Sequence, residues 1–328
     1  MKINGEIWVV AEQRQGKLIR ITLELLGRAL SLAAETEADV GVVIMGNKTD
    51  SLCRELAQKG ADRLYCVEND SLEHFNPELY SRIVSELARE YKPRIILLGA
   101  TVQGSAVSPA VAAKLGSGLT AHCCEVSLAK QGRLLQVVPS LEGYYVFVSH
   151  QYPEMATISP GVLPLLSLEK AGKGEIVQKE LSSLSGYQDV KTKVISLKKS
   201  EKPAVSLEDA EVIVAGGAGV GSDGWAMLHE LAEVLGGVVG ATRPAVDEGW
   251  IDHERLIGQS GKSVSPRLYI AVGISGDPLH LSGLREPEMF FAINKNPKAT
   301  IFQFADYGVV ADYKKILPLL IETAGRKL

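Results

Sequence analysis

The stretch from residue 257 to residue 294, IGQSGKSVSPRLYIAVGISGDPLHLSGLREPEMFFAIN, decides the fold of the second half of the chain. Its apolar run Leu268–Val272 predicts a buried strand, with glycine-flanked turns on both sides at 258–261 and 273–276. Glycine in such turns lets backbone N–H groups approach a phosphate or a ring closely. Asp277 and Pro278 then suit an N-cap and a first helical position, so positive potential is expected near the start of a short helix.

A second glycine-rich turn precedes this stretch. A strand is expected at 211–215 and an amphipathic helix at 225–235, and between them residues 216–224, GGAGVGSDG, satisfy the G-x-G-x-x-G pattern. A nucleotide ligand is therefore implied. NAD fits less well, because residues 236–240 lack the acidic side chain that should follow about 20 residues after the motif.

Residues 205–323 resemble the FAD-binding domain of the electron-transfer flavoprotein alpha subunit, whose signature runs from the strand Leu268–Val272 through Ser275, Gly276 and His280 to Asn294. Further family-like stretches are ATRPAVD at 241–247, FADYGVVAD at 304–312, LLGAT at 97–101 and GSGLTA at 116–121. The resemblance implies FAD as cofactor, electron transfer as function, and an obligate heterodimer with a beta subunit. It also implies an acyl-CoA or related dehydrogenase as partner, and a C-terminal domain that swivels about residues 200–206.

The resemblance also implies roles for single residues around the flavin ring. Ser260 would lie beside flavin N5, on a loop that Gln259 holds against the ring. Arg243, after Thr242, would place a positive charge by the isoalloxazine and favour reduced, negatively charged flavin. His280 would face the pyrimidine edge, where negative charge gathers on reduction.

The remaining expected contacts involve the phosphates, the ribityl chain and the ADP half of FAD. Ser275 and Gly276 would donate to the phosphates or the ribityl chain, and Asn294 and Asp312 would contact the ADP half. The complete expected cofactor-binding set is Gly217, Ala218, Gly219, Thr242, Arg243, Ile257, Gly258, Gln259, Ser260, Ser275, Gly276, Asp277, Pro278, Leu279, His280, Asn294 and Asp312.

Structural alternatives stay open for five of these residues. They are an ST turn for Ser260, a surface ion pair with Asp247 or Glu248 for Arg243, a satisfied turn residue for His280, a strand end for Asn294, and the N-cap of a helix over 312–323 for Asp312.

The chain departs from the family pattern at two places. Ala218 stands where the family has arginine, and Asp277, Pro278 and Leu279 stand where relatives read Ala-Ile-Gln. These changes remove positive charge and donors, so we hypothesise a more negative flavin potential or weaker FAD retention than in a typical relative. A specialised paralogue with weakened flavin binding therefore stays an alternative.

The first half alternates apolar runs with helical patterns, which predicts a parallel α/β domain. Strands are expected at 6–11, 40–45, 63–67 and 94–98, and helices at 18–34, 51–59, 78–91 and 106–115. From residue 121 the pattern changes to strands at 136–139, 144–149 and 155–159, and an antiparallel extension is expected there. A lysine-rich linker over 169–205, with one weak strand at 192–197, separates the expected N-terminal domain, 1–204, from a Rossmann-like FAD-binding domain, 205–328.

Composition narrows the function classes. The 328 residues are 46% hydrophobic and 23% charged with a net charge of −4, which argues against a nucleic-acid partner. Neither a membrane-spanning run nor a targeting segment is recognisable, so a cytoplasmic protein without membrane insertion is expected. The four cysteines show no C-x-x-C spacing and are expected to be reduced thiols.

The sequence also lacks a Ser–His–Asp order, zinc-ligand spacing and a framed pair of catalytic carboxylates. An electron carrier is therefore expected rather than a substrate-converting enzyme, with no metal and no catalytic residue. An NAD(P)-dependent dehydrogenase using residues 219–224 is the competing interpretation, and a structural nucleotide-binding subunit is a third.

Overall fold

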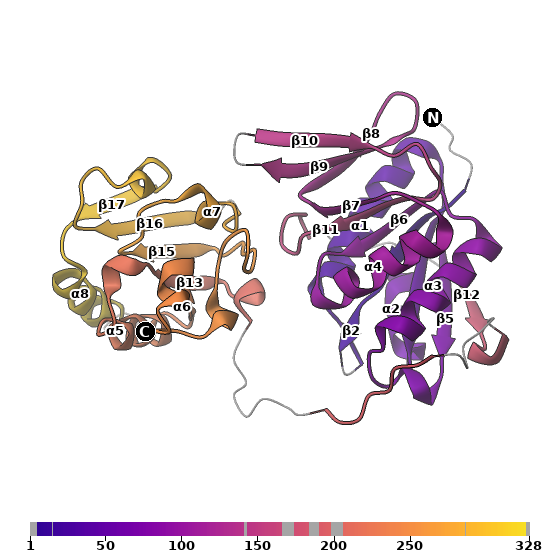
Figure 1. Cartoon of the computed structure of the whole chain (residues 1–328), viewed down its shortest axis with the longest axis horizontal. Coiled ribbons are helices and arrows are strands. Elements are labelled where there is room, and N and C mark those ends of the chain that lie inside the picture. Colours follow the sequence, from indigo (N-terminus) through magenta and orange to yellow (C-terminus); the bar gives the residue numbers. More distant parts are fainter. Residues whose placement is uncertain are drawn as a thin grey trace. The chain divides into compact units, whose positions relative to one another are not determined.

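The computed structural model describes residues 5–14, 16–140, 143–165, 174–183, 190–197, 206–285 and 287–325. The chain divides into two compact units, Met1–Lys199 and Ser200–Leu328, and each is described by itself (Figure 1). Among the described residues, no helix has the length and apolar character that crossing a bilayer requires.

The N-terminal unit is built on a seven-stranded parallel sheet with strand order β12-β5-β4-β1-β6-β11-β7. Its strands are β1 (Ile7–Val10), β4 (Val40–Gly46), β5 (Arg63–Glu68), β6 (Ile95–Gly99), β7 (Leu119–Cys123), β11 (Glu154–Ile158) and β12 (Glu175–Lys179), and a short hairpin joins β2 (Gln13–Arg14) to β3 (Lys17–Leu18). The parallel α/β prediction is confirmed.

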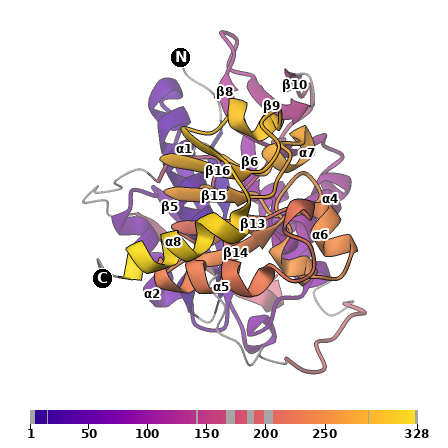
Figure 2. The ribbon, with the colours of Figure 1, turned by 90° about the vertical axis from the view of Figure 1, so that its left-hand side faces the viewer.

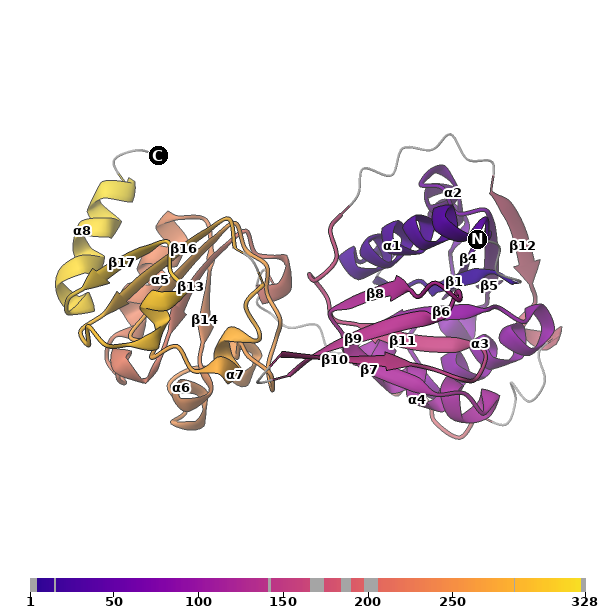
Figure 3. The same ribbon diagram turned by 90° about the horizontal axis from the view of Figure 1, so that it is seen from above.

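Helices cover both faces of this sheet, as Figure 3 shows. Helices α1 (Arg20–Thr36) and α2 (Asp50–Gln58) pack on one face, and α3 (Pro77–Tyr91) and α4 (Val102–Leu115) pack on the other. Successive residues of β1 alternate between the two cores, because side chains of a strand point to opposite faces. Because helices cover both faces of the sheet, the side chains on both sides of β1, β4 and β6 are buried, and the sequences of these strands are continuous apolar runs.

The predicted antiparallel extension is right for one part of its span and wrong for another. Strands β8 (Glu125–Leu128), β9 (Leu134–Ser140) and β10 (Gly143–Val148) form an antiparallel sheet. Strand β11, in contrast, lies between β6 and β7 and runs parallel to both. All five of its residues are buried, and burial on both faces is available only inside the helix-covered sheet.

The expected linker also contains structure that the sequence did not indicate. Residues 175–179 form β12, which pairs with β5 at the edge of the sheet. The weak strand expected at 192–197 does not form. Thr192 is instead held by side chains, since its carbonyl accepts from Asn76 and its N–H donates to Glu78. The proposed swivel at 200–206 falls almost entirely outside the described residues.

The prediction of reduced cysteines is wrong for one pair. Cys53 on α2 and Cys66 on β5 form a disulfide, because the inward face of the helix sets one side chain above the other within the same core. Cys123 and Cys124 remain reduced, as expected.

The C-terminal unit is a five-stranded parallel sheet with strand order β14-β13-β15-β16-β17, and Figure 2 shows β14, β13, β15 and β16 in this order. Its strands are β13 (Val212–Gly216), β14 (Val238–Ala241), β15 (Leu268–Val272), β16 (Met289–Asn294) and β17 (Tyr307–Val310). Helices α5 (Trp225–Val234), α6 (Arg243–Asp247) and α8 (Tyr313–Gly325) contribute to one core, and short α7 (Pro278–Leu281) follows β15. The chain leaves β13 towards β14 and returns to β15 on the other side, so the topological switch point lies between β13 and β15.

Candidate functional site at the carboxyl edge of the C-terminal sheet

The parallel strands bring most of the predicted site residues to one edge of the C-terminal sheet. Residues 217–219 follow β13, Thr242 and Arg243 follow β14, and residues 273–277 follow β15. Asn294 ends β16, and Asp312 follows β17 by two positions. Ligands of open parallel sheets bind outside the carboxyl ends of strands at the switch point, so the topology alone gathers these residues where a ligand is expected.

The glycines of the first turn are required by contact between two loops. A Cβ on Gly217 would lie 2.4 Å from the carbonyl oxygen of Gly273, and one on Gly219 would lie 2.8 Å from the same atom. The Gly219 N–H donates to that carbonyl at 3.0 Å. The turns after β13 and β15 are therefore in direct backbone contact.

The loop over 257–261 is positioned from two sides. Ile257 N–H donates to the carbonyl of Ala241 at the end of β14, and Gln259 N–H donates to the carbonyl of Leu279 on α7. Gly258 has a φ of 140°, and a Cβ there would lie 2.8 Å from the Leu279 carbonyl oxygen. This loop is thus fixed between β14 and α7, with Gln259 and Ser260 exposed.

Arg243 and Ser260 meet, although 17 residues separate them in sequence. The Arg243 Nη1 donates to Ser260 Oγ at 3.2 Å, and its Nε donates to Asp247 Oδ1 at 2.7 Å. The alternative ion pair with Asp247 is therefore present, and Arg243 in addition contacts the loop that carries Ser260. The Arg243 side chain is 56% exposed, so the guanidinium is fixed and still reachable from solvent.

His280 is buried and makes contacts within the domain. Its Nδ1 lies 3.0 Å from the carbonyl oxygen of Ile257, and its Nε2 lies 2.8 Å from the hydroxyl of Tyr269. A carbonyl only accepts, so Nδ1 carries the proton and Nε2 accepts from the tyrosine. Burial lowers the pKa of His280, so the ring is neutral at neutral pH. Both ring nitrogens of His280 have partners within the domain, which is the structural alternative for this residue. Neither nitrogen faces the carboxyl edge of the sheet, where a ligand is expected.

Asn294 and Asp312 also have structural contacts. Asn294 donates from Nδ2 to the Ile274 carbonyl at 2.8 Å, which ties β16 to the turn after β15. Asp312 accepts the Lys314 N–H at 2.9 Å and so caps α8. Both residues lie at the carboxyl edge of the sheet, and their side-chain bonds are those of the structural alternatives.

The turn over 275–277 presents backbone donors. In the described part of the chain, the N–H groups of Ser275 and Gly276 make no hydrogen bond, whereas the Asp277 side chain accepts the Leu279 N–H at 2.8 Å and caps α7. Gly276 has a φ of 93°, and a Cβ there would lie 2.3 Å from the Ile301 nitrogen. The N–H groups of Ser275 and Gly276 are therefore available as donors at the carboxyl edge of the sheet, where Ala218 and Ser275 are exposed.

Two residues of α8 that the sequence did not single out complete this edge. The Tyr313 hydroxyl donates to the Val220 carbonyl at 2.7 Å, and Gly224 makes room for it, since a Cβ there would lie 2.4 Å from the hydroxyl oxygen. Lys314 pairs with Asp223 at 2.8 Å beside the glycine-rich turn. The sequence did contain a signal for this contact. Gly224, the third glycine of the G-x-G-x-x-G pattern, marks a place where another element packs closely.

A dinucleotide fits this donor set. Backbone N–H groups at 275–276, at the switch point of a parallel sheet, suit phosphate oxygens. Arg243 adds a fixed positive charge beside the exposed loop that carries Ser260. The end of β14 carries Thr242 and Arg243 instead of the acidic residue that binds the ribose of NAD, so the structure agrees with the weak NAD signal in the sequence.

Comparison with known proteins places the chain in a family. Residues 7–184 match the electron transfer flavoprotein domain, and residues 206–285 match the electron transfer flavoprotein FAD-binding domain. An electron transfer flavoprotein subunit alpha from Thermoanaerobacterium thermosaccharolyticum is 43% identical over 97% of both chains. The protein FixB of Clostridium saccharobutylicum is 40% identical over 97% of this chain and 96% of its own. The acryloyl-CoA reductase electron transfer subunit beta of Anaerotignum propionicum is 33% identical over 97% and 95%. The chain belongs to the electron transfer flavoprotein alpha-subunit family.

Proposed function

We propose that the chain binds FAD at the carboxyl edge of the C-terminal sheet and carries electrons between a dehydrogenase and a downstream acceptor, paired with a beta subunit. The observation that carries the proposal is the contact of the 217–219 turn with the turn after β15 at the switch point, with Arg243 at the same edge of the sheet, after β14. An acyl-CoA or related dehydrogenase is the proposed donor, because one relative is named as an electron transfer subunit of acryloyl-CoA reductase.

The residues of this edge would position the cofactor and set its electrostatic surroundings. FAD, when bound, supplies the redox chemistry. Ser275 and Gly276 offer N–H donors for phosphate oxygens, and Arg243 holds a positive charge by the loop that carries Ser260. His280 stays neutral and fixes this loop through the Ile257 carbonyl, so Arg243 and not His280 supplies local charge.

Removing the Arg243 guanidinium should weaken FAD binding at least tenfold. A hydrogen bond to a charged group contributes about 1.5–3 kcal/mol, and about 1.4 kcal/mol corresponds to a tenfold change in affinity. The measurement is the flavin absorbance that Arg243→Ala retains during dialysis, together with the midpoint potential. Arg267→Ala is the matched control. Arg267 directly precedes β15, so this substitution removes the same charge from the opposite edge of the sheet. Equal flavin retention in both variants would refute the role of Arg243.

Restoring an arginine at position 218 should raise the flavin potential and slow FAD loss. Ala218 is exposed and opens the short turn 218–220 at the same edge, so a guanidinium can be added without displacing a buried group. The expected gain in affinity is about tenfold, as for one additional charge-assisted contact. Potentiometric titration of Ala218→Arg against wild type measures it, and an unchanged potential and affinity would remove the hypothesis that this substitution weakens the site.

Strand β10 is the surface that we propose for docking the beta subunit. It pairs with β9 alone among the described strands, and its apolar side chains are exposed on both faces: Tyr144, Tyr145, Val146, Phe147 and Val148. Exposed apolar edge strands mark sites of association. A subunit that covers both faces of β10 would remove this surface from water.

A charge in β10 should therefore disrupt the heterodimer. Val146 is 58% exposed, and Val146→Lys should weaken co-purification of the beta subunit at least tenfold, because a lysine would have to be desolvated in an apolar interface. Ile195→Lys is the control, since Ile195 is 94% exposed in the same unit and belongs to no strand. Size-exclusion chromatography of the co-expressed subunits reads out both. Dissociation by both variants, or by neither, would contradict the assignment of β10.

A further inference from the structure

The N-terminal unit has a topological switch point of its own. Strand order β4-β1-β6 places it between β1 and β6, because the chain leaves β1 towards β4 and later crosses back to β6. The residues just beyond the carboxyl ends of these strands are Ala11 and Glu12 on one side and Ala100 and Thr101 on the other. In open parallel sheets this crevice is the place where a ligand binds.

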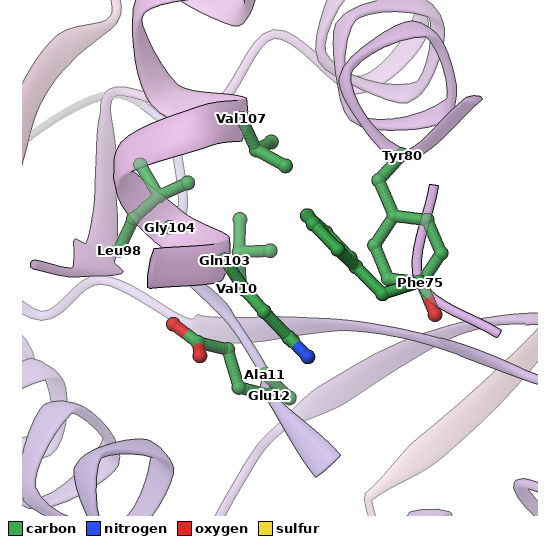
Figure 4. A pocket seen from close by; sticks show the side chains of 9 residues that line it. All are labelled: Val10, Ala11, Glu12, Phe75, Tyr80, Leu98, Gln103, Gly104 and Val107. Carbon is green, nitrogen blue, oxygen red and sulfur yellow. The ribbon is translucent and has the colours of Figure 1, made fainter. Parts of the chain in front are cut away.

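The side chain of Glu12 fills this crevice. It is 7% exposed, and Thr101 Oγ1 lies 2.9 Å from its Oε1 and 2.7 Å from its Oε2. The same hydroxyl accepts the Gly104 N–H at 3.0 Å. A chain of hydrogen bonds thus runs from the first turn of α4 through Thr101 to the carboxyl group. Figure 4 shows the Glu12 side chain among the residues that line the neighbouring pocket.

Two glycines next to this carboxyl group leave no room for larger side chains at their positions. A Cβ on Gly99 would lie 2.7 Å from Glu12 Oε1, and a Cβ on Gly104 would lie 3.2 Å from it and 1.9 Å from the Gly99 carbonyl oxygen. The backbone of Glu12 is fixed as well, since its N–H donates to Thr22 Oγ1 and its carbonyl accepts from that hydroxyl, both at 2.8 Å. The carboxyl group is thereby held against the amino end of α4, which has fourteen residues.

These are the components with which such folds bind a phosphate: a helix amino end, a hydroxyl at the N-cap, and glycines that permit close approach. We propose that the Glu12 carboxyl group is the resident occupant of the phosphate position of the N-terminal unit and excludes nucleotides from it. On this assignment Glu12 is a specificity-determining residue, and the chain binds its nucleotide in the C-terminal unit alone. The proposal is independent of which flavin the C-terminal unit holds.

Removing the side chain should therefore create an anion site. The probe is radiolabelled inorganic phosphate, measured by equilibrium dialysis on the full-length chain loaded with flavin, so that the C-terminal site is filled. The pH is 8, because burial raises the pKa of Glu12 to about 7 and the wild-type carboxyl must be ionised. We expect Glu12→Ala to bind phosphate at least about tenfold more tightly than wild type, as expected when a helix amino end and a hydroxyl become available to an anion.

Two further variants make the result specific. Glu68→Ala removes a carboxylate that accepts from the N–H and hydroxyl of Thr49 at the start of α2, on the same sheet edge but away from the switch point, and should gain no phosphate binding. Thr101→Val added to Glu12→Ala should abolish the gain. Glu12→Ser replaces Glu12→Ala if the alanine variant does not fold.

Two outcomes would overturn the proposal. One is phosphate binding by the folded Glu12→Ala or Glu12→Ser protein that equals wild-type binding. The other is phosphate binding by the wild-type protein that Thr101→Val removes, which would show that the crevice is already open to ligands.

Discussion

Glu12→Gln should increase the free energy of unfolding of the N-terminal unit by about 3 kcal/mol at pH 8. Burial raises the pKa of Glu12 from its ordinary 4.5 to about 7, against the opposing effects of the Thr101 hydroxyl and the Arg14 charge. Each pKa unit corresponds to about 1.4 kcal/mol. Glutamine keeps the shape and an acceptor for Thr101 but has no charge to desolvate.

The sign of the pH dependence follows from the raised folded pKa. Between pH 4.5 and about 7 the folded protein holds a proton that the unfolded chain has released, so the Glu12 contribution to stability falls as pH rises through this window. Above pH 7 the contribution is constant. Glu12→Gln should lack this decline, and the two proteins should differ little at pH 4.5.

Amide hydrogen exchange of β1 is the suitable measurement, since it reports opening of the N-terminal unit without assuming that the two units unfold together. Glu68→Gln is the control, because it removes the same charge from an exposed position. An equal decline from pH 5 to pH 8 in wild type and Glu12→Gln would contradict the assignment of the buried ionisation to Glu12.

Gly276→Ala should destabilise the C-terminal unit by about 3 kcal/mol and weaken FAD binding ten- to a hundredfold. Gly276 has a φ of 93°, and strained backbone conformations of this kind disfavour alanine by about 1–3 kcal/mol. The added Cβ would also lie 2.3 Å from the Ile301 nitrogen, whose N–H donates to the Ser275 carbonyl. That contact is between backbones, so the 275–277 turn itself must shift.

Gly236→Ala separates the two causes. Gly236 also has a positive φ, of 66°, but a Cβ there meets nothing within 4 Å. It should lower stability by about 1–2 kcal/mol through backbone conformation alone and leave FAD affinity unchanged. Thermal unfolding and flavin release of both variants are the measurements. If Gly236→Ala released FAD as readily as Gly276→Ala, the loss would come from general destabilisation and not from the turn.

Much of the C-terminal unit could be predicted from local patterns. The apolar run at 268–272 is β15 residue for residue, and Asp277 caps the helix that begins at Pro278. Both features depend on side chains and hydrogen bonds within a few residues of one another, which sequence records directly. The glycine turns were predicted for the same reason, although contact between the turns after β13 and β15 was not visible in either alone.

Residues whose partners are distant in sequence behaved differently. His280 has the predicted place after the 273–276 turn, yet its ring bonds to Tyr269 and Ile257. Strand β11 follows an antiparallel hairpin but enters the parallel sheet, because full burial of its side chains requires helices on both faces. Cys53 and Cys66 carry no motif, and the packing of α2 on β5 alone brings them together.

The sequence by itself determined the family, the α/β architecture and the glycine-bearing loops at the C-terminal switch point, because backbone conformation and apolar periodicity are local properties. Only the tertiary structure decided which polar groups remain available to a ligand. It satisfies His280, Asn294 and Asp312 internally, exposes Arg243, and buries Glu12 at the second switch point. The physical reason is that burial and hydrogen-bond partners are set by segments that meet only in the folded chain.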